Sequence, residues 1–423
     1  MRHLIIGAGP AGVVAAEQLR KLDPQGTVTL IGDEAEPPYS RMAIPYLLMD
    51  RIGEPGTYLR KGPGHYEKLG IEVLRDRVSA VDARAKSVTL SGGGKRSYDK
   101  LLIATGASPV APKIPGIDLP GVGACWTLAD ARKIIERAHQ GSSVVLIGAG
   151  FIGCIILEAL VERGVKLTVV EREDRMVPRM LNETAGGMLR RWCERRGVAV
   201  RVSSQVEAIE AVKGAPALRV LLGGGDAIPA DLVIQATGVR SNTSFLEGSG
   251  IATDQGILVN EFLAASVPDV YAAGDVAQGR DFSTGAYVVQ AIQPTAVEHG
   301  RVAALHMARG HSHPQRGTLN MNVLDTLGLV STSFAQWMGV QGGEAAELKD
   351  PEQFRYINLQ FEDDVLVGAT ALGLTDHVGV LRGLIQGKTE LGPWKNKLQA
   401  DPTRLMEAYL SRTLPVGHNA YVI

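Results

Sequence analysis

The chain has 423 residues, of which 45% are hydrophobic and 21% charged, enough for several domains with their own cores. Its 44 lysines and arginines are balanced by 45 aspartates and glutamates, so no basic excess predicts a nucleic acid or an anionic membrane as partner. The sequence has no apolar run of the roughly 18 residues that a membrane span needs and no signal-peptide pattern, so a cytoplasmic protein is expected.

The first predicted nucleotide-binding unit covers residues 3–33. An apolar strand (4–6) leads through the glycine-rich turn GAGPAG into a helical stretch (13–22) and a second strand (28–31). In this spacing the first glycine permits a tight turn, the second lets the backbone approach a pyrophosphate, and the third lets helix pack on strand. The residues predicted to contact the dinucleotide are Gly7, Gly9, Pro10, Ala11, Gly12, Asp33 and Glu34.

A second unit of the same kind covers residues 143–171. A strand (144–147) leads through GAGFIG into a helix that reaches about Arg163, and a second strand (167–170) ends at Glu171. A carboxylate there favours the ribose diol of NAD over the 2′-phosphate of NADP, although Arg172 and Arg175 leave NADPH open. The predicted contacts are Gly148, Gly150, Phe151, Ile152, Gly153 and Glu171.

The rest of the chain suggests how the two units are connected. A proline-rich segment (107–116) is typical of a crossing between domains, and residues 256–310 are expected to return to the first domain. The last ~110 residues, with strand-like runs at 356–361 and 365–369, predict a third domain.

Cysteine and histidine spacing predicts neither a redox disulfide nor a metal site. Cys125, Cys154 and Cys193 are scattered, without CxxC or CxxxxC spacing. Four histidines lack metal-like spacing with cysteine or carboxylate: His311, His313, His377 and His418.

Three further motifs follow apolar strands: ATG at 104–106, ATG at 236–238, and VYAAGDVA at 270–277. Together with the two glycine turns they resemble the FAD-dependent pyridine nucleotide-disulfide oxidoreductase superfamily. The resemblance is to its branch of ferredoxin and rubredoxin reductases and nitrite-reductase flavoproteins, which lacks a redox disulfide. It implies an α/β fold with two Rossmann-like domains, the NAD domain inserted in the FAD domain, and a C-terminal α+β interface domain. The implied boundaries are 1–112 with 243–316 for FAD, 113–242 for NAD(H), and 317–423 for the interface domain.

The resemblance also assigns single residues to FAD. Asp275 would hydrogen-bond the ribitol chain, with Gly274 supplying the turn that brings the backbone to the pyrophosphate. Arg41, in the segment PYSR, would meet FAD phosphate or ribityl oxygens, and the backbone of Val78 would contact the adenine. Other positions implied to line the cofactors are Ala104, Thr105, Gly106 and Gly238.

The sequence departs from the family pattern beside the expected flavin. Residues 40–46, SRMAIPY, lack the reactive cysteine of the oxidase and coenzyme A disulfide reductase members, so thiol chemistry there is not predicted. Tyr46 stands where the ferredoxin-reductase branch has a lysine, and Ile155 stands where it has the partner glutamate. Both members of an ion pair are absent together, which indicates a more apolar nicotinamide pocket.

The resemblance implies hydride transfer between NAD(H) and FAD, with single electrons exchanged with an iron–sulfur or rubredoxin-type partner in a homo- or hetero-oligomer. No residue is predicted to act as a general acid or base. Three alternatives stay open: the FAD subunit of a multi-subunit tungsten aldehyde oxidoreductase that passes electrons from clusters to NAD⁺, a flavin- and NADH-binding sensor or scaffold with poor turnover, and a disulfide reductase.

Overall fold

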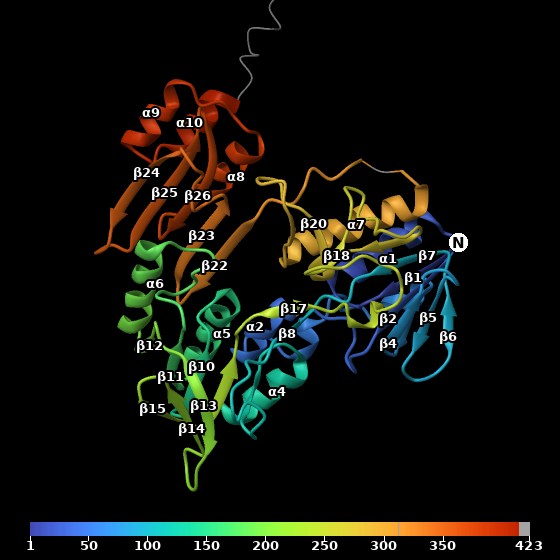
Figure 1. The fold of residues 1–423 in the computed structure, drawn as a ribbon, viewed down its shortest axis with the longest axis horizontal. Coiled ribbons are helices and arrows are strands. Elements are labelled where there is room, and N and C mark those ends of the chain that lie inside the picture. The colour runs from blue at the N-terminus through green and yellow to red at the C-terminus, as the bar shows by residue number, and fades with distance from the viewer. Residues whose placement is uncertain (312, 414–423) are drawn as a thin grey trace, which may run out of the picture. The chain divides into compact units, whose positions relative to one another are not determined.

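The computed structural model describes residues 1–311 and 313–413, so His418 lies outside the described residues. The chain folds as two compact units, each described here by itself (Figure 1). Unit 1 comprises Met1–Val110, Trp126–Ala131 and Val239–Thr318, and unit 2 comprises Ala111–Cys125, Arg132–Gly238 and the chain from Leu319 onward. Each unit contains a five-stranded parallel sheet, which confirms the predicted α/β class with two Rossmann-like units. The three-domain boundaries stay a prediction.

The parallel sheet of unit 1 has the strand order β19-β7-β1-β2-β3. Its central strands are almost continuous apolar runs, as expected for a parallel sheet that is covered on both faces. The order reverses at β1, and in such sheets ligands bind at the carboxyl ends of the strands beside this point. The strands are β1 (Arg2–Ile6), β2 (Thr27–Gly32), β3 (Ile71–Arg75), β7 (Lys100–Ile103) and β19 (Val270–Ala272).

Two helices of unit 1 pack closely on each other, α1 (Pro10–Leu22) and α7 (Gln293–Arg309). The close approach depends on Gly300, because a Cβ there would lie 2.4 Å from the carbonyl oxygen of Ala11. Pro10 begins α1, where its missing N–H costs no helical hydrogen bond.

Smaller elements complete unit 1. The two three-stranded sheets contain β4 (Val78–Asp82), β5 (Ser87–Leu90) and β6 (Lys95–Ser97), and β18 (Ile257–Leu258), β20 (Ala277–Arg280) and β21 (Tyr287–Val289). A two-stranded pair joins β8 (Ala107–Pro109) and β17 (Val239–Ser241). The short helices are α2 (Ile44–Leu48), α3 (His65–Lys68), η1 (Arg41–Ala43), η2 (Glu54–Thr57), η3 (Ser244–Leu246) and η4 (Gly274–Val276).

The parallel sheet of unit 2 has the order β12-β11-β10-β16-β9. Its strands are β9 (Val122–Ala124), β10 (Ser143–Ile147), β11 (Lys166–Val170), β12 (Ala199–Arg201) and β16 (Leu232–Gln235). An antiparallel meander, β13 (Val206–Ala211), β14 (Leu218–Leu222) and β15 (Ala227–Ala230), packs its apolar side chains against the strands. The helices are α4 (Leu128–Arg137), which begins in unit 1, α5 (Phe151–Glu162) and α6 (Glu183–Arg195).

The C-terminal part of unit 2 is an antiparallel sheet in the order β22-β23-β26-β25-β24, with three helices. The strands predicted at 356–361 and 365–369 are β25 (Arg355–Glu362) and β26 (Val365–Leu372). The other elements are β22 (Met321–Thr326), β23 (Leu329–Ala335), β24 (Glu344–Asp350), α8 (Val378–Gln386), α9 (Pro393–Ala400) and α10 (Leu405–Thr413).

Two kinds of feature are absent from the part of the chain that the structure describes. Among residues 1–311 and 313–413, no helix combines the length and the hydropathy needed to cross a bilayer. The same part of the chain holds no group of three or more His, Cys, Asp or Glu side chains placed to bind a metal ion.

Candidate cofactor-binding site

The glycine turn after β1 shows a separate physical need at each glycine. Gly7 has φ 112°, and a Cβ there would lie 2.1 Å from the carbonyl oxygen of Ala104. A Cβ at Gly12 would lie 1.9 Å from the carbonyl oxygen of Gly7, so this glycine lets α1 pack on the turn. A Cβ at Gly9 would meet no atom within 4 Å. The middle glycine therefore faces open space at the start of a helix, which fits a pyrophosphate.

The turn after β10 in unit 2 repeats this arrangement. Gly148 has φ 102°, and a Cβ there would lie 2.5 Å from the carbonyl oxygen of Ala236. A Cβ at Gly153 would lie 2.2 Å from the carbonyl oxygen of Gly148, whereas one at Gly150 would meet nothing within 4 Å. Two independent turns thus leave the same kind of space open, and both fit a dinucleotide.

Glu171 lies beside the second turn, because Val170 pairs with Ile147 in the parallel ladder. Its buried carboxylate accepts hydrogen bonds from the backbone N–H of Ala149 at 2.7 Å and of Glu173 at 2.9 Å. A carboxylate has about four acceptor positions, so it retains capacity for ribose hydroxyls.

The two arginines that leave NADPH open already have partners. Arg172 pairs with Glu173 at 2.8 Å, and Arg175 pairs with Asp174 at 2.6 Å. Arg175 also donates from Nε to the carbonyl oxygen of Leu181 at 2.9 Å.

The acids after β2 are arranged differently from Glu171. Ile31 pairs with Ile6, so Gly32 takes the register position that Glu171 has in unit 2. Asp33 pairs with the exposed Arg77 at 2.8 Å, and Glu34 accepts a 2.5 Å hydrogen bond from the Tyr39 hydroxyl. Asp33 and Glu34 therefore follow the register position of Glu171 by one and two residues.

Arg41 is fixed on both sides in unit 1. Its guanidinium pairs with Glu34 at 2.8 Å and donates to the carbonyl oxygen of Trp126 at 2.8 Å. The Trp126 indole in turn donates to the carbonyl oxygen of Ala107 at 3.0 Å. Sequence reasoning missed this link, because 85 residues separate Arg41 from Trp126 and neither the spacing nor the residue types signal it.

Asp275 lies on η4, next to Gly274 with φ 75°. Burial raises the pKa of its carboxyl group, and the positive charge of Arg41 opposes that rise. Ser241 fixes the backbone here by donating to the carbonyl oxygen of Asp275 at 2.7 Å. The predicted residues Arg41 and Asp275 are therefore close enough for their charges to interact.

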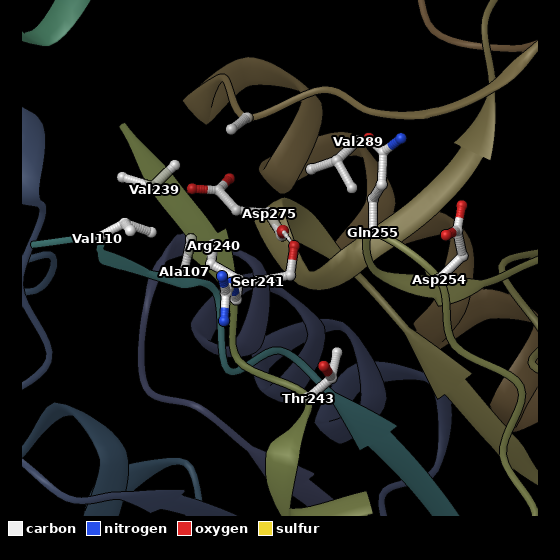
Figure 2. Close-up of a pocket in the computed structure, with 11 residues that line it drawn as sticks. Ala107, Val110, Val239, Arg240, Ser241, Thr243, Asp254, Gln255, Asp275 and Val289 are labelled. Atoms are coloured by element: carbon white, nitrogen blue, oxygen red, sulfur yellow. Dashed lines mark hydrogen bonds between the residues drawn. The ribbon is translucent and has the colours of Figure 1, made fainter. Parts of the chain in front are cut away.

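A cavity of about 400 Å³ opens beside Asp275 within unit 1 (Figure 2). Its volume is in the range of small-molecule sites. Figure 2 shows the Asp275 carboxylate among side chains from β8, β17 and the loop before β18. Six of the lining residues are Ala107, Val239, Arg240, Ser241, Asp254 and Gln255.

His299 on α7 supports the same loop from the interior. The N–H of Gly274 donates to its Nδ1 at 3.4 Å, and its Nε2 lies 3.3 Å from the hydroxyl of Thr318. Burial lowers the pKa of His299 to about 4, so the ring is neutral near pH 7.

The other positions predicted to line the cofactors are spread over several segments of the chain. Asn242 and Thr105 join two segments, since the Asn242 amide donates to the Thr105 carbonyl at 2.9 Å and the Thr105 hydroxyl donates to the Asn242 carbonyl at 3.0 Å. Val78 begins β4 with a buried side chain. Gly106 has φ 64° and Gly238 has φ 118°, and a Cβ at either would meet nothing within 4 Å.

The cysteines are all buried. Burial raises the pKa of the Cys193 thiol to about 12 and that of Cys154 well above its usual value. Few thiolates therefore form at Cys154 and Cys193 near neutral pH. Met42 and Tyr46, in the segment predicted to face the flavin, are 48% and 49% exposed.

Comparison with known proteins gives the family. Residues 1–308 match the family described as pyridine nucleotide-disulphide oxidoreductase. The chain belongs to this family. It is 30% identical over 414 residues to the NADH-dependent phenylglyoxylate dehydrogenase subunit epsilon of Aromatoleum evansii, covering 97% of this chain and 98% of that protein. It is 34% identical over 275 residues to the biphenyl dioxygenase system ferredoxin–NAD(+) reductase component of Paraburkholderia xenovorans, covering 64% and 66%.

The fold is also found in the covalent putidaredoxin reductase–putidaredoxin complex. The TM-score is 0.89 at 23% sequence identity, and the match covers 97% of this chain and 99% of that one. Family membership makes the protein an FAD-dependent oxidoreductase that binds FAD and NAD(H), which confirms the predicted cofactors and enzyme class. The residues assigned to each cofactor stay a prediction.

Proposed function

We propose that the protein exchanges electrons between NAD(H) and an iron–sulfur or rubredoxin-type partner, with FAD bound in unit 1 and NAD(H) in unit 2. The observation that carries this proposal is the pair of glycine turns with open middle glycines, Gly9 and Gly150. Bound FAD supplies the exchange between a two-electron hydride and single electrons. The protein's own groups bind and orient the cofactors, and the buried cysteines give no support for a thiol step.

The geometry around each turn supports the proposed assignment of residues to the two cofactors. The backbone N–H groups at the starts of α1 and α5 would face the two pyrophosphates. Asp275 would accept hydrogen bonds from the ribitol chain, and its neighbour Arg41 would balance charge on FAD phosphate. The remaining turn residues shape the space and carry no chemistry.

Glu171 supports NAD(H) over NADP(H). It is 8% exposed and held by two backbone N–H groups, so a 2′-phosphate would meet a fixed negative charge. We expect Glu171→Gln to raise the KM for NADH at least tenfold, which corresponds to a loss of about 1.4 kcal/mol of binding free energy. The ratio of kcat/KM for NADH to kcat/KM for NADPH should fall.

Steady-state kinetics with both nucleotides measure this effect. Glu183→Gln, at an exposed carboxylate at the start of α6, serves as the control and should leave the ratio unchanged. An unaltered ratio in Glu171→Gln would contradict the assignment of Glu171.

We further propose that the chain works as a subunit of a larger cytoplasmic assembly. Support comes from the relative named as a subunit epsilon, which matches over 98% of its length, whereas the ferredoxin–NAD(+) reductase component matches over 66%. In such an assembly electrons would run from clusters to NAD⁺, from a 2-oxo acid or aldehyde substrate. The FAD subunit of a multi-subunit tungsten aldehyde oxidoreductase, one of the alternatives from the sequence, would be such a subunit.

Anaerobic purification of the native protein tests the subunit proposal. Co-elution with a cluster-bearing subunit, together with NADH formation from its reduced clusters, is expected.

A second candidate, a stand-alone reductase, is favoured by the similarity to the ferredoxin–NAD(+) reductase component. A homodimer that reduces free ferredoxin or rubredoxin with NADH would establish it and would overturn the subunit proposal. If the flavoprotein oxidised NADH with neither ferredoxin nor rubredoxin as acceptor, the result would support the alternative of a sensor or scaffold with poor turnover.

A further inference from the structure

An arginine-rich segment of unit 2 leads up to β12, the strand that pairs with β11 before Glu171. Residues 190–201, which cover the end of α6 and reach β12, contain five arginines and one glutamate in a chain with net charge −1. The single acid, Glu194, pairs with Arg190 at 2.8 Å. Positive charge is therefore concentrated locally and left largely unbalanced.

Two of these arginines form an arginine–aromatic patch with Trp192 and Phe354. The rings of Trp192 and Phe354 meet edge to face, with centroids 5.0 Å apart. The guanidinium carbon of Arg196 lies 3.3 Å from the centroid of Trp192, and that of Arg195 lies 4.8 Å from the centroid of Phe354. Each guanidinium is thus held against an aromatic ring.

The patch is anchored to two elements of unit 2. The Trp192 indole N–H donates to the carbonyl oxygens of Thr326 and Leu327, each at 3.1 Å, in the turn between β22 and β23. Phe354 is buried directly before β25. The rings therefore cannot rotate away without breaking contacts in the C-terminal sheet, and the arginines are stacked on fixed surfaces.

The two stacked arginines lie at the surface of unit 2. Arg195 and Arg196 are exposed, and neither takes part in any of the ion pairs found among the described residues. Stacking occupies the faces of a guanidinium but leaves its N–H edge free to bind a carboxylate through two hydrogen bonds. Little side-chain entropy is then lost on binding, because the orientation is already fixed.

We propose that the arginine–aromatic patch is a docking site for a protein partner with a carboxylate-rich surface. Arginine and tryptophan are the residue types that dominate binding energy at protein interfaces. A protein is favoured over a nucleic acid because the chain as a whole, with net charge −1, lacks the field that attracts a polyanion. The proposal rests on the proposed function only in that the partner would be another subunit of the assembly.

A fluorescent glutamate-rich peptide, with a glutamine version as the neutral reference, tests the patch on the FAD-loaded full chain. Fluorescence anisotropy at low salt is expected to show binding of the acidic peptide to the wild type, and at least tenfold weaker binding to Arg195→Gln/Arg196→Gln. The matched control Arg84→Gln/Arg96→Gln removes two exposed arginines from unit 1 and should bind like the wild type. Arg195→Lys/Arg196→Lys keeps the charge but lacks the planar fork, and most of the affinity should still be lost.

Three results would overturn the proposal: no binding of the peptide to the wild type, equal binding to the Arg195→Gln/Arg196→Gln variant, or tighter binding of a DNA duplex or of anionic lipid vesicles than of the peptide. The rate of flavin reduction by NADH is measured on the same samples and should not change in any variant. A failure of that reaction in the wild type would count against the proposed function and leave the docking test standing.

Discussion

At the scale of single residues, the glycines of the two turns differ in what they tolerate. Gly9 and Gly150 are the N-cap residues directly before α1 and α5, with φ −80° and −75°, which any residue adopts, and both face open space. We expect Gly9→Ala to fold normally but to bind FAD at least tenfold more weakly, because the methyl group occupies the place of the pyrophosphate. Flavin titration of the apoprotein measures this.

Gly150→Ala is the matched control. It should retain FAD with normal affinity and raise the dissociation constant for NADH instead, which isothermal titration of the flavin-loaded variant measures. If both variants bound both cofactors normally, or if the effects were exchanged, the assignment of the cofactors to the two units would be wrong.

His299 links a residue to the pH dependence of stability. Its pKa is lowered to about 4 by burial, so between the usual value near 6.5 and pH 4 the unfolded chain binds a proton that the folded chain does not. The contribution of His299 to the free energy of unfolding is therefore fully present above pH 6.5. It falls as the pH drops, by about 2 kcal/mol at pH 5.

The neutral variant His299→Gln should lose this component while the contributions of other groups remain. Thermal unfolding of the holoenzyme at pH 7 and pH 5, followed by circular dichroism, compares the two proteins. A wild type that loses no more stability than His299→Gln on acidification would show that the ring is protonated in the folded state.

Sequence reasoning reaches residues whose role is local. The glycine spacing predicts the turns around Gly7 and Gly148, because each steric need arises within the turn or at the neighbouring strand end. It does not predict that Arg41 donates to Trp126, or that His299 accepts from Gly274, since these contacts join segments far apart in the chain.

At the scale of elements, the packing of α1 on α7 depends on Gly300. A Cβ at this position would lie 2.4 Å from the carbonyl oxygen of Ala11, which is backbone and cannot move aside cheaply. We expect Gly300→Ala to lower the free energy of unfolding by about 1–3 kcal/mol, although alanine favours helix more than glycine.

Chemical denaturation measures this loss. Gly187→Ala is the control, because Gly187 is helical in α6 and a Cβ there meets nothing within 4 Å. This substitution should stabilise the protein slightly or leave it unchanged. A Gly300→Ala variant as stable as Gly187→Ala would contradict the tight contact between α1 and α7.

The parallel strands were predictable because their apolar runs are short, buried and bounded by turns. The order in which these strands pair in the sheet was not predictable. The order β19-β7-β1-β2-β3 brings a strand from residue 270 beside one from residue 100, and only tertiary packing decides such a pairing. The sequence predicts a helical stretch from residue 13, whereas α1 begins at Pro10, because proline is tolerated in the first turn, where its missing N–H has no helical partner.

At the scale of the whole molecule, the repeated unit is what the sequence predicts most directly. Both turns have the same steric pattern, yet their acids differ, with Glu171 beneath one turn and Gly32 at the corresponding position of the other. This asymmetry agrees with different dinucleotides in the two units. The arginine–aromatic patch could not be predicted, because Trp192 and Phe354 meet only through the contact of α6 with the C-terminal sheet.

The proposed function requires that NADH reduces the flavin bound to this chain. Mixing the FAD-loaded protein with stoichiometric NADH in the absence of oxygen tests it most directly, with the visible absorbance of the flavin as the readout. We expect rapid bleaching in the wild type and slower bleaching in Gly150→Ala at the same NADH concentration. An unchanged visible spectrum, with FAD demonstrably bound, would contradict it.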